Sequence, residues 1–233
     1  MWPRTPAALE AAQRELAAAS PAPWAPGDEP LAIGACVVTW PRGERGPGAA
    51  GDPGWAAAAL VRAGRVIADA VVRGAAGAPY APGLLALREG PLLEAAVRAL
   101  ALAPDVLLVD ATGGDHPRGA GLALHLGAVV GLPTAGVTHR ALLATGAWPA
   151  DARGATSPLL LDGQRVGSWL RTRAGTRPLA VHAGWRTSPD VAVAVVAAAG
   201  AGHRTPEPLR VARRLARRAR RRVITPRSRP ARC

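Results

Sequence analysis

LLVDATGGDHPRGAGLALHLG, residues 107–127, is the clearest indication of the fold. In this stretch an apolar run is followed by one aspartate and by a glycine-rich turn that opens a helix. Residues 106–109 are predicted to form a short buried strand, and residues 118–130 a helix. A strand, a turn and a helix in this order are typical of open α/β sheets, which bind ligands outside the carboxyl ends of their strands. Asp110 lies at such an end. It is therefore the first candidate functional residue.

The segments on either side of this unit complete a mixed α/β pattern. Ala63-Gly64 and Asp162-Gly163 each join two strand-like segments and predict β-hairpins. Ser188-Pro189-Asp190 predicts a helix start, with a capping serine, a proline at the first helical position and an acid in the first turn. Further helices are predicted over residues 6–19, 91–103 and 191–198, and strands over residues 31–40, 55–62, 65–73, 133–137, 158–161, 165–171 and 179–182. This order predicts a mixed sheet flanked by helices, as in ribonuclease H-like α/β folds.

Positive charge is concentrated near the end of the chain. The net charge is +13, and 11 of the 29 basic side chains, all of them arginine, follow residue 206. We expect residues 1–209 to form one domain and residues 210–233 an Arg-rich basic tail. The tail's arginines surround a helix axis without a clean apolar stripe, which predicts a solvated segment. Such a tail favours a polyanion such as nucleic acid as a partner.

The remaining composition limits the location of the protein. Cys36 and Cys233 give no disulfide framework, which fits a reducing cytosol. The first residues carry charges where a signal peptide needs an apolar segment, and no run of about 20 apolar residues offers a membrane span. We expect a cytoplasmic monomer without a membrane partner.

Three acids stand beside apolar segments far apart in the sequence: Glu89, Asp110 and Asp190. Mg²⁺ prefers hard oxygen ligands from one or two carboxylates together with water and phosphate, so these acids are candidate ligands. Each also has a structural interpretation, since Glu89 and Asp190 are equally suited to the first turn of a helix. A zinc site is not favoured, because the cysteines lie far from any pair of histidines with ligand spacing.

Five short motifs occur in one order along the chain. They are Pro79-Tyr80-Ala81-Pro82-Gly83, Leu87-Arg88-Glu89, Val109-Asp110, His116-Pro117-Arg118 with Gly121, His125 and Gly127, and Pro133-Thr134 with Gly136-Val137. In order and spacing the chain resembles endonuclease V, the deoxyinosine 3′ endonuclease family, from about Leu9 to Arg213. The resemblance implies a ribonuclease H-like DNA-repair nuclease that cuts a phosphodiester near a deaminated base. It also implies Mg²⁺, or alternatively Mn²⁺, as cofactor and inosine-containing DNA or RNA as partner.

The resemblance assigns roles to individual residues. Glu89, Asp110 and Asp190 match positions of the family's metal site, and His116 matches its active-site histidine. The wedge that enters the duplex while the altered base rotates out matches Pro79, Tyr80, Ala81 and Pro82. The wall of the base pocket matches Gly83, Leu85, Ala111, Leu122, Gly136 and Leu142.

The residues themselves agree with the wedge. Pro79 and Pro82 stiffen a short loop that carries Tyr80, the only tyrosine of the chain, and a stiff loop can hold an aromatic ring toward a base stack. The structural alternative is a tyrosine that plugs an edge of the core.

Four positions depart from the family, and one of them is Trp185, which stands where a histidine is usual. Cys36 stands where the first strand of the family carries a metal-binding aspartate, and a thiol is a poor ligand for Mg²⁺. His139 stands where the family has an active-site lysine, and it supplies positive charge only if its pKa is high enough. Ala111 stands where the family has glycine, so its methyl group narrows the base pocket. Asp52, in the long loop over residues 41–54, is a hypothetical substitute for the missing aspartate.

These departures leave three interpretations open. The first is an active metal-dependent nuclease in which Glu89, Asp110 and Asp190 suffice, assisted by His116 and His139. The second is an inosine-binding homologue that keeps the wedge, the pocket and the basic tail but has lost efficient cutting. The third, a nonspecific nucleic-acid coat, predicts salt-sensitive binding without base preference and leaves the five motifs unexplained.

Overall fold

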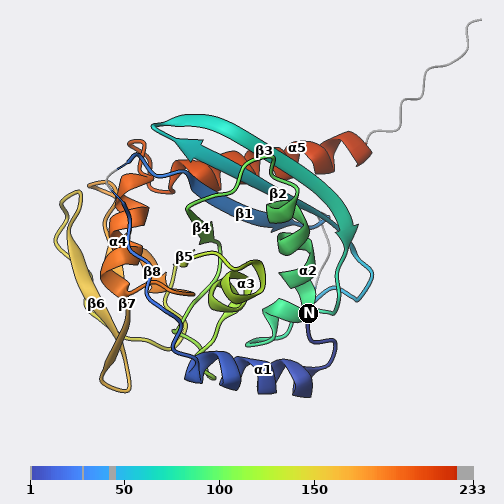
Figure 1. Ribbon diagram of the computed structural model, residues 1–233, viewed down its shortest axis with the longest axis horizontal. Helices are drawn as coiled ribbons and strands as arrows, with labels where there is room; N and C mark the ends of the chain where they lie inside the picture. Colours follow the sequence, from blue (N-terminus) through green and yellow to red (C-terminus); the bar gives the residue numbers. More distant parts are fainter. Residues whose placement is uncertain (1, 28, 42–45, 225–233) are drawn as a thin grey trace, which may run out of the picture.

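Eight strands form one mixed sheet in the computed structural model, which describes residues 2–27, 29–41 and 46–224 (Figure 1). The strands are β1 (Ile33–Thr39), β2 (Pro53–Arg62), β3 (Arg65–Ala75), β4 (Val106–Val109), β5 (Thr134–Thr138), β6 (Thr156–Leu161), β7 (Gln164–Leu170) and β8 (Leu179–Ala183). Their order across the sheet is β3-β2-β1-β4-β5-β8-β7-β6. The central strands β1, β4 and β5 run parallel, and the outer strands pair antiparallel. The carboxyl ends of the three central strands therefore meet at one edge.

Both predicted hairpins are present. Ala63 and Gly64 join β2 to β3 with φ angles of 48° and 75°, and Asp162 and Gly163 join β6 to β7 with φ angles of 49° and 76°. Two consecutive residues with positive φ define the type I′ turn, whose twist matches that of the flanking strands. The local turn chemistry alone was sufficient to predict both.

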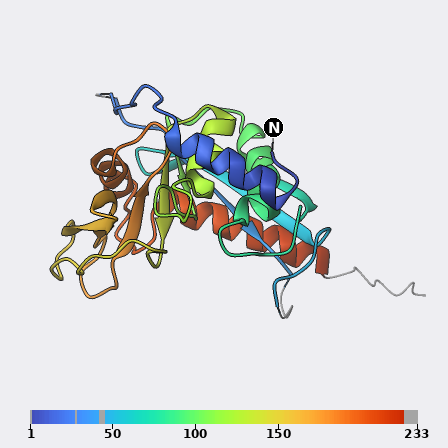
Figure 2. The same cartoon turned by 90° about the horizontal axis from the view of Figure 1, so that it is seen from below.

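Helices cover both faces of the sheet. The helices α1 (Pro6–Ala18), α2 (Leu85–Arg98) and α3 (Leu122–Val130) lie on one face, and α4 (Pro189–Ala198) and α5 (Glu207–Ile224) lie on the other (Figure 2). Alternate residues of β1 point to opposite faces, so that Ala35 and Val37 pack with α4 and α5 while Cys36 packs with α2 and α3. In the part of the chain that the structure describes, no helix is both long and apolar enough for a membrane span.

The helix α2 begins six residues before the predicted start. Pro91, the first residue of the predicted helix, lies inside α2, which runs from Leu85 to Arg98. A proline in a helix leaves a carbonyl of the preceding turn without its usual partner, and Gly77 N donates to Arg88 O at 3.3 Å beside this point. Glu89 consequently lies within the helix and not at its first position.

The helix α5 differs from the predicted solvated tail. Leu209, Val211, Ala212 and Ala216 are buried in the core against the sheet, and Arg220 Nη1 donates to Thr39 Oγ1 at 2.9 Å. The predicted boundary after residue 209 thus falls inside a packed helix. Its buried stripe consists mainly of small side chains, which let the helix approach β1 and β2 closely. Residues 225–233 of the predicted tail lie outside the described residues.

Candidate active site

Asp110 directly follows β4, at the end of the strand predicted to carry the site. Side chains alternate along β4, with Leu108 in the core beneath α4 and α5 and Val109 in the core beneath α2 and α3. Asp110 continues this alternation toward α5, where Arg213 Nη2 donates to its Oδ2 at 2.7 Å. The side chain of Asp110 is 40% exposed and that of Arg213 is 24% exposed. The carboxylate therefore faces a positive charge from a helix that is distant in sequence.

The turn after Asp110 lies tightly against the neighbouring strand β8. A Cβ atom on Gly113 would lie 1.8 Å from the carbonyl oxygen of Ala183, so only glycine allows this approach. Gly121 N donates to Gly113 O at 2.8 Å and closes the turn before α3 begins. The glycines thus fix the backbone on which Asp110 and His116 stand.

Glu89 supplies a second carboxyl group near Asp110. Its Oε1 accepts a hydrogen bond from Trp40 Nε1 at 3.2 Å. Burial, with a smaller contribution from the charge of Asp110, raises the pKa of Glu89 to about 7, although the Trp40 hydrogen bond opposes the shift. At neutral pH this side chain is therefore protonated in a large fraction of molecules.

Cys36 lies in the middle of β1, opposite Val109 of β4, and is fully buried. Burial, together with the charges of Glu89 and Asp110, raises the pKa of the Cys36 thiol far above its ordinary range. A neutral, soft thiol is a poor ligand for a hard cation such as Mg²⁺.

Asp190 does not lie with the other two acids. It stands in the first turn of α4, where its side chain is 80% exposed, and its Oδ1 lies 2.9 Å from Arg165 Nη2. Arg165 belongs to β7, which two strands separate from β4. The structural interpretation of Asp190 as a first-turn acid accounts for this position.

Asp52 is not a substitute for the missing aspartate. Its Oδ2 accepts hydrogen bonds from Ala49 N at 2.7 Å and from Arg88 Nη2 at 2.9 Å. The Ala49 amide and then the Arg88 guanidinium hold the pKa of Asp52 below its ordinary value. This carboxylate fixes the loop over α2, and its contacts with Ala49 and Arg88 do not favour it as a metal ligand.

His139 is exposed and lies just after β5. Partial burial, followed by the positive charges of Arg204 and Arg213, lowers its pKa below the ordinary value of histidine. A lowered pKa does not favour the hypothesis that His139 supplies the charge of a lysine, which stays a prediction. Arg213 carries the positive charge at this place.

The donors around Asp110 do not fit a hard divalent cation. Among the described residues no group of three or more His, Cys, Asp or Glu side chains is suited to a metal ion. Near Asp110 stand a largely buried carboxyl group, a buried neutral thiol and a guanidinium. Mg²⁺ keeps nearly ideal octahedral oxygen geometry, and a guanidinium in contact with the carboxylate opposes its approach.

His116 supports the neighbouring loop. Arg118 N donates to its Nδ1 at 3.2 Å, so the proton lies on Nε2, which donates to the Gly83 carbonyl oxygen at 3.2 Å. Burial, followed by the charge of Arg118, lowers the pKa of His116. At neutral pH the ring is a neutral hydrogen-bond donor that positions Gly83.

The Gly83 carbonyl oxygen is the anchor of the Tyr80 loop. It also accepts from Arg118 Nη2 at 2.7 Å and from Gln13 Nε2 at 3.2 Å, and Gly83 has a φ of 73° that favours glycine. At the tip of the same loop Tyr80 is 51% exposed. The loop is thus held at its base and presents an aromatic ring to solvent.

A small cavity opens between this loop and the Asp110 turn. Its volume is about 210 Å³. It is lined by Gln13, Tyr80, Pro82, Gly83, Leu85, Ala86, Asp110, Ala111, Thr112, His116, Leu122, Thr138 and Leu142. Of the predicted pocket residues, Gly136 alone is absent from this lining. It lies behind the turn, where an added Cβ would stand 2.3 Å from the carbonyl oxygen of Ala111.

Asp115, which was not among the predicted site residues, holds one wall of this cavity. The carboxylate is fully buried and accepts hydrogen bonds at 2.7 to 2.8 Å from the backbone amides of Leu142, Leu143 and Ala144. These bonds fix the segment from which Leu142 reaches the cavity. An acid inside a glycine-rich turn was the only sequence signal for this role, and it drew attention to Asp110 instead.

Comparison with known proteins gives consistent matches. Residues 48–214 match the sequence profile of the endonuclease V family. Endonuclease V of Streptomyces coelicolor is 43% identical over 166 residues, which make up 70% of this chain and 71% of the relative.

Solved structures show the same fold. Endonuclease V of Streptomyces avermitilis superimposes with a TM-score of 0.84 at 36% identity, and the match covers 96% of both chains. Endonuclease V of Ciona intestinalis, solved with a 24mer DNA that contains an inosine followed by a ribo-adenosine, gives a TM-score of 0.74 at 18% identity over 93% of this chain and 98% of that one. These likenesses confirm the predicted ribonuclease H-like fold class.

Proposed function

Because the chain belongs to the endonuclease V family, a family of phosphodiester endonucleases, we propose that it acts on nucleic acid containing a deaminated purine. The cavity beside Asp110 would receive the altered base after it has rotated out of the stack. The DNA in the Ciona complex, which contains an inosine, supports this class of ligand.

The observation that carries the proposal is the cavity itself. Its volume of about 210 Å³ is below the roughly 300 Å³ at which pockets for drug-sized ligands begin, so a single base suits it better than a whole nucleotide. Its walls combine apolar side chains such as Leu85 and Leu122 with a few polar groups such as Thr112 and Thr138. Planar, weakly polar ligands bind in cavities of this kind.

Tyr80 is proposed to take the place that the base vacates. Extruding a base costs a few kcal/mol and is easiest at a mismatched or damaged pair, so a wedge at the cavity mouth contributes to selectivity. The exposed ring lines the cavity and its loop is anchored through Gly83, which supports a rigid wedge. A tyrosine that plugs the core would be buried instead.

The side chains near Asp110 distinguish two versions of the family's activity. One is metal-dependent cleavage, and the other is base recognition with inefficient cutting. Endonuclease V relatives imply divalent-metal-dependent cleavage, and Mg²⁺ or Mn²⁺ is the proposed metal for that version. The Arg213 ion pair and the buried Cys36 favour the second version, recognition of the deaminated base with inefficient cutting. Asp190 has no place in either version of the site.

The test uses duplexes that differ in one base. Binding to an inosine duplex and to the matching adenine duplex is measured by fluorescence anisotropy, and nicking is scored on denaturing gels with Mg²⁺ or Mn²⁺. We expect tighter binding to the inosine duplex, with DNA and RNA versions compared side by side. Equal affinity for the inosine and adenine duplexes would overturn the proposed function.

Tyr80→Ala tests the wedge. We expect a loss of inosine affinity of roughly 5-fold to 150-fold, in line with about 1 to 3 kcal/mol per stacked base. Trp148→Ala is the matched control, because Trp148 is similarly exposed but is not part of the cavity lining. Equal losses in the two variants would remove Tyr80 from the proposed site.

A further inference from the structure

Arg213 occupies the side of Asp110 that faces α5. Its Nη2 donates a hydrogen bond to Asp110 Oδ2, and the two atoms lie 2.7 Å apart. A guanidinium has five N–H donors, so most of them remain for another acceptor. The pair is partly exposed, and such pairs contribute only about 0 to 1 kcal/mol to stability. Stabilisation of the fold is therefore a weak explanation for it.

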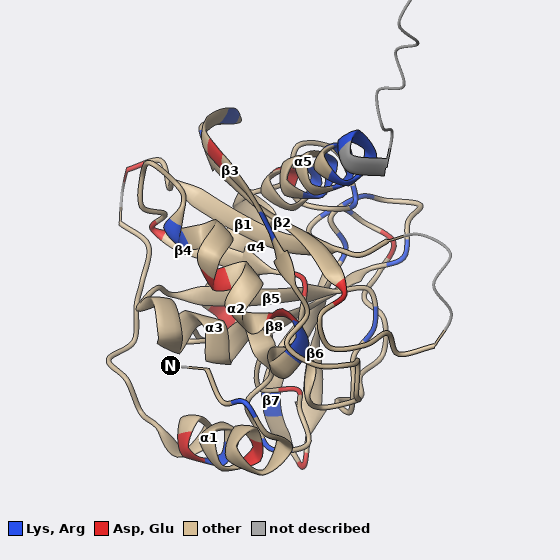
Figure 3. Ribbon diagram, turned by 90° about the vertical axis from the view of Figure 1, so that its right-hand side faces the viewer, with Lys and Arg blue, Asp and Glu red and all other residues tan. Residues whose placement is uncertain are grey.

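The surroundings of this pair suit an anion. Figure 3 shows the basic residues gathered along α5. A groove of about 540 Å³ on this helix is lined by arginines only: Arg210, Arg213, Arg214, Arg217, Arg218 and Arg221. Guanidinium groups match the geometry of phosphate oxygens and bind them with paired hydrogen bonds.

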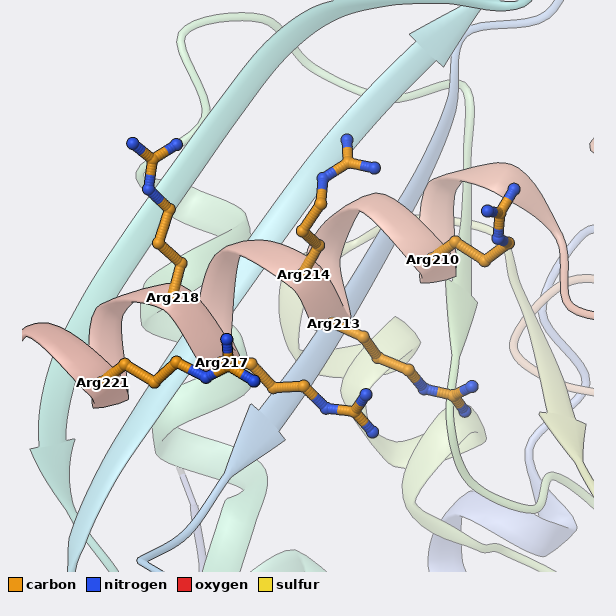
Figure 4. A pocket seen from close by; sticks show the side chains of 6 residues that line it. All are labelled: Arg210, Arg213, Arg214, Arg217, Arg218 and Arg221. Atoms are coloured by element: carbon orange, nitrogen blue, oxygen red, sulfur yellow. The ribbon is translucent and has the colours of Figure 1, made fainter.

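The arginines of the groove form two rows. Figure 4 shows Arg213 and Arg217 directed to one side of α5 and Arg214 and Arg218 directed to the other. Residues four apart lie on the same face of a helix, which explains the two rows. Arg213, at the end of its row, donates a hydrogen bond to Asp110. It therefore links the arginine groove to the mouth of the cavity, which Asp110 also lines.

We propose that Arg213 replaces a divalent metal as the cation at Asp110 and holds the backbone phosphate next to the extruded base. The inference rests on the proposed function, because it concerns the phosphate of the same nucleic acid. A guanidinium neutralises phosphate charge but is not a Lewis acid and does not generate a nucleophile from water. The protein thus binds deaminated-base nucleic acid without a metal and does not cut it efficiently.

The first test measures the metal response of binding. Affinity of the wild-type protein for the inosine duplex is compared in EDTA and in Mg²⁺ at matched ionic strength, because added ions weaken phosphate contacts by themselves. We expect the two affinities to agree within about twofold, with at most inefficient nicking in either condition. A severalfold tighter complex in Mg²⁺ would overturn the inference.

The second test removes the cation. Arg213→Ala is expected to weaken binding in EDTA by roughly tenfold or more, the usual effect of losing a charge-assisted hydrogen bond to phosphate. Arg214→Ala is the matched control, since it removes the same charge from the other row. Both variants should lower the salt slope by about one, but only Arg213→Ala should bind the inosine duplex more tightly when Mg²⁺ is added. Equal affinities and equal metal responses in the two variants would contradict the role of Arg213.

A direct measurement of metal binding separates this inference from activity. Titration with Mn²⁺ followed by calorimetry is expected to show no site near Asp110 in the wild type and a site in Arg213→Ala combined with Cys36→Asp. If the buried Cys36→Asp substitution prevents folding, the titration is carried out with the single variant Arg213→Ala. Loss of inosine preference refutes the proposed function, whereas Mn²⁺ binding by the wild type refutes only the inference, so the two failures are distinguishable.

Discussion

At the scale of single residues, the buried carboxylate of Asp115 supports one wall of the cavity. It accepts three backbone amides from the segment that carries Leu142. A buried acceptor with three donors is satisfied, and removal of any part of this arrangement leaves polar groups without partners. His182 Nδ1 lies 3.7 Å from Asp115 Oδ2, so the core side of the carboxylate is also polar.

Asp115→Asn is predicted to loosen this wall. One carboxylate oxygen becomes an amide that faces a backbone N–H donor, which should lower the free energy of unfolding by about 1 to 3 kcal/mol. Inosine affinity should fall as well. Urea unfolding and anisotropy measure the two effects. Asp162→Asn is the control, because this exposed hairpin residue has a φ of 49° that asparagine tolerates. If both variants behave alike, Asp115 does not support the cavity.

At the scale of elements, α5 combines two functions on one helix. Leu209, Val211, Ala212 and Ala216 pack against the sheet, and the arginines cover the remaining surface. The sequence predicts a tail for this segment because arginines dominate it and its buried side chains are small. Alternating apolar residues and hairpin turns are local sequence signals. A stripe of small side chains on a helix predicts packing only when the surface that it contacts is known.

Ala216→Leu is predicted to destabilise the protein. The added methyl groups would have to enter the packed contact between α5 and the sheet, and overpacking of this kind costs about 1 to 3 kcal/mol. Ala11→Leu, on the exposed side of α1, is the matched control and should be neutral. The denaturant midpoint distinguishes them. An unchanged midpoint for Ala216→Leu would mean that α5 is not packed as described.

At the scale of the whole molecule, buried titratable groups couple stability to pH. Burial lowers the pKa of His125 to about 4, and burial also lowers the pKa of His182 to about 4 against the opposing charge of Asp115. Between about pH 4 and pH 6.5 both side chains are therefore largely neutral in the folded protein, whereas they are largely charged in the unfolded chain. Glu89 acts in the opposite direction between its ordinary pKa and about 7.

The predicted consequence is a loss of stability in mild acid. Below the ordinary histidine value of about 6.5 the unfolded chain binds more protons than the folded one, so the free energy of unfolding decreases from about pH 6.5 to about pH 4. His125 alone contributes on the order of 2 to 3 kcal/mol to this change. Urea unfolding at several pH values measures the slope.

Matched histidine variants identify the source of the slope. His125→Gln should flatten it, whereas His203→Gln, at an exposed position, should leave it unchanged. A slope that is identical in the wild type and in His125→Gln would show that His125 is not the group responsible.

The mixed sheet, the two hairpins, the family and the strand that carries Asp110 could all be predicted from the sequence. These features depend on local patterns: apolar alternation, paired turn residues and short motifs in a fixed order. The pairing of charged side chains depends on the packed fold and could not be predicted in this way. The fold placed Asp190 beside Arg165, bound Asp52 to Arg88 and brought Arg213 to Asp110 from a helix 103 positions further along the chain. Ion pairs form between the side chains that the packed elements bring together. The eight arginines of α5 cannot be distinguished by their local sequence, and their packing against the sheet determines which of them pairs with Asp110.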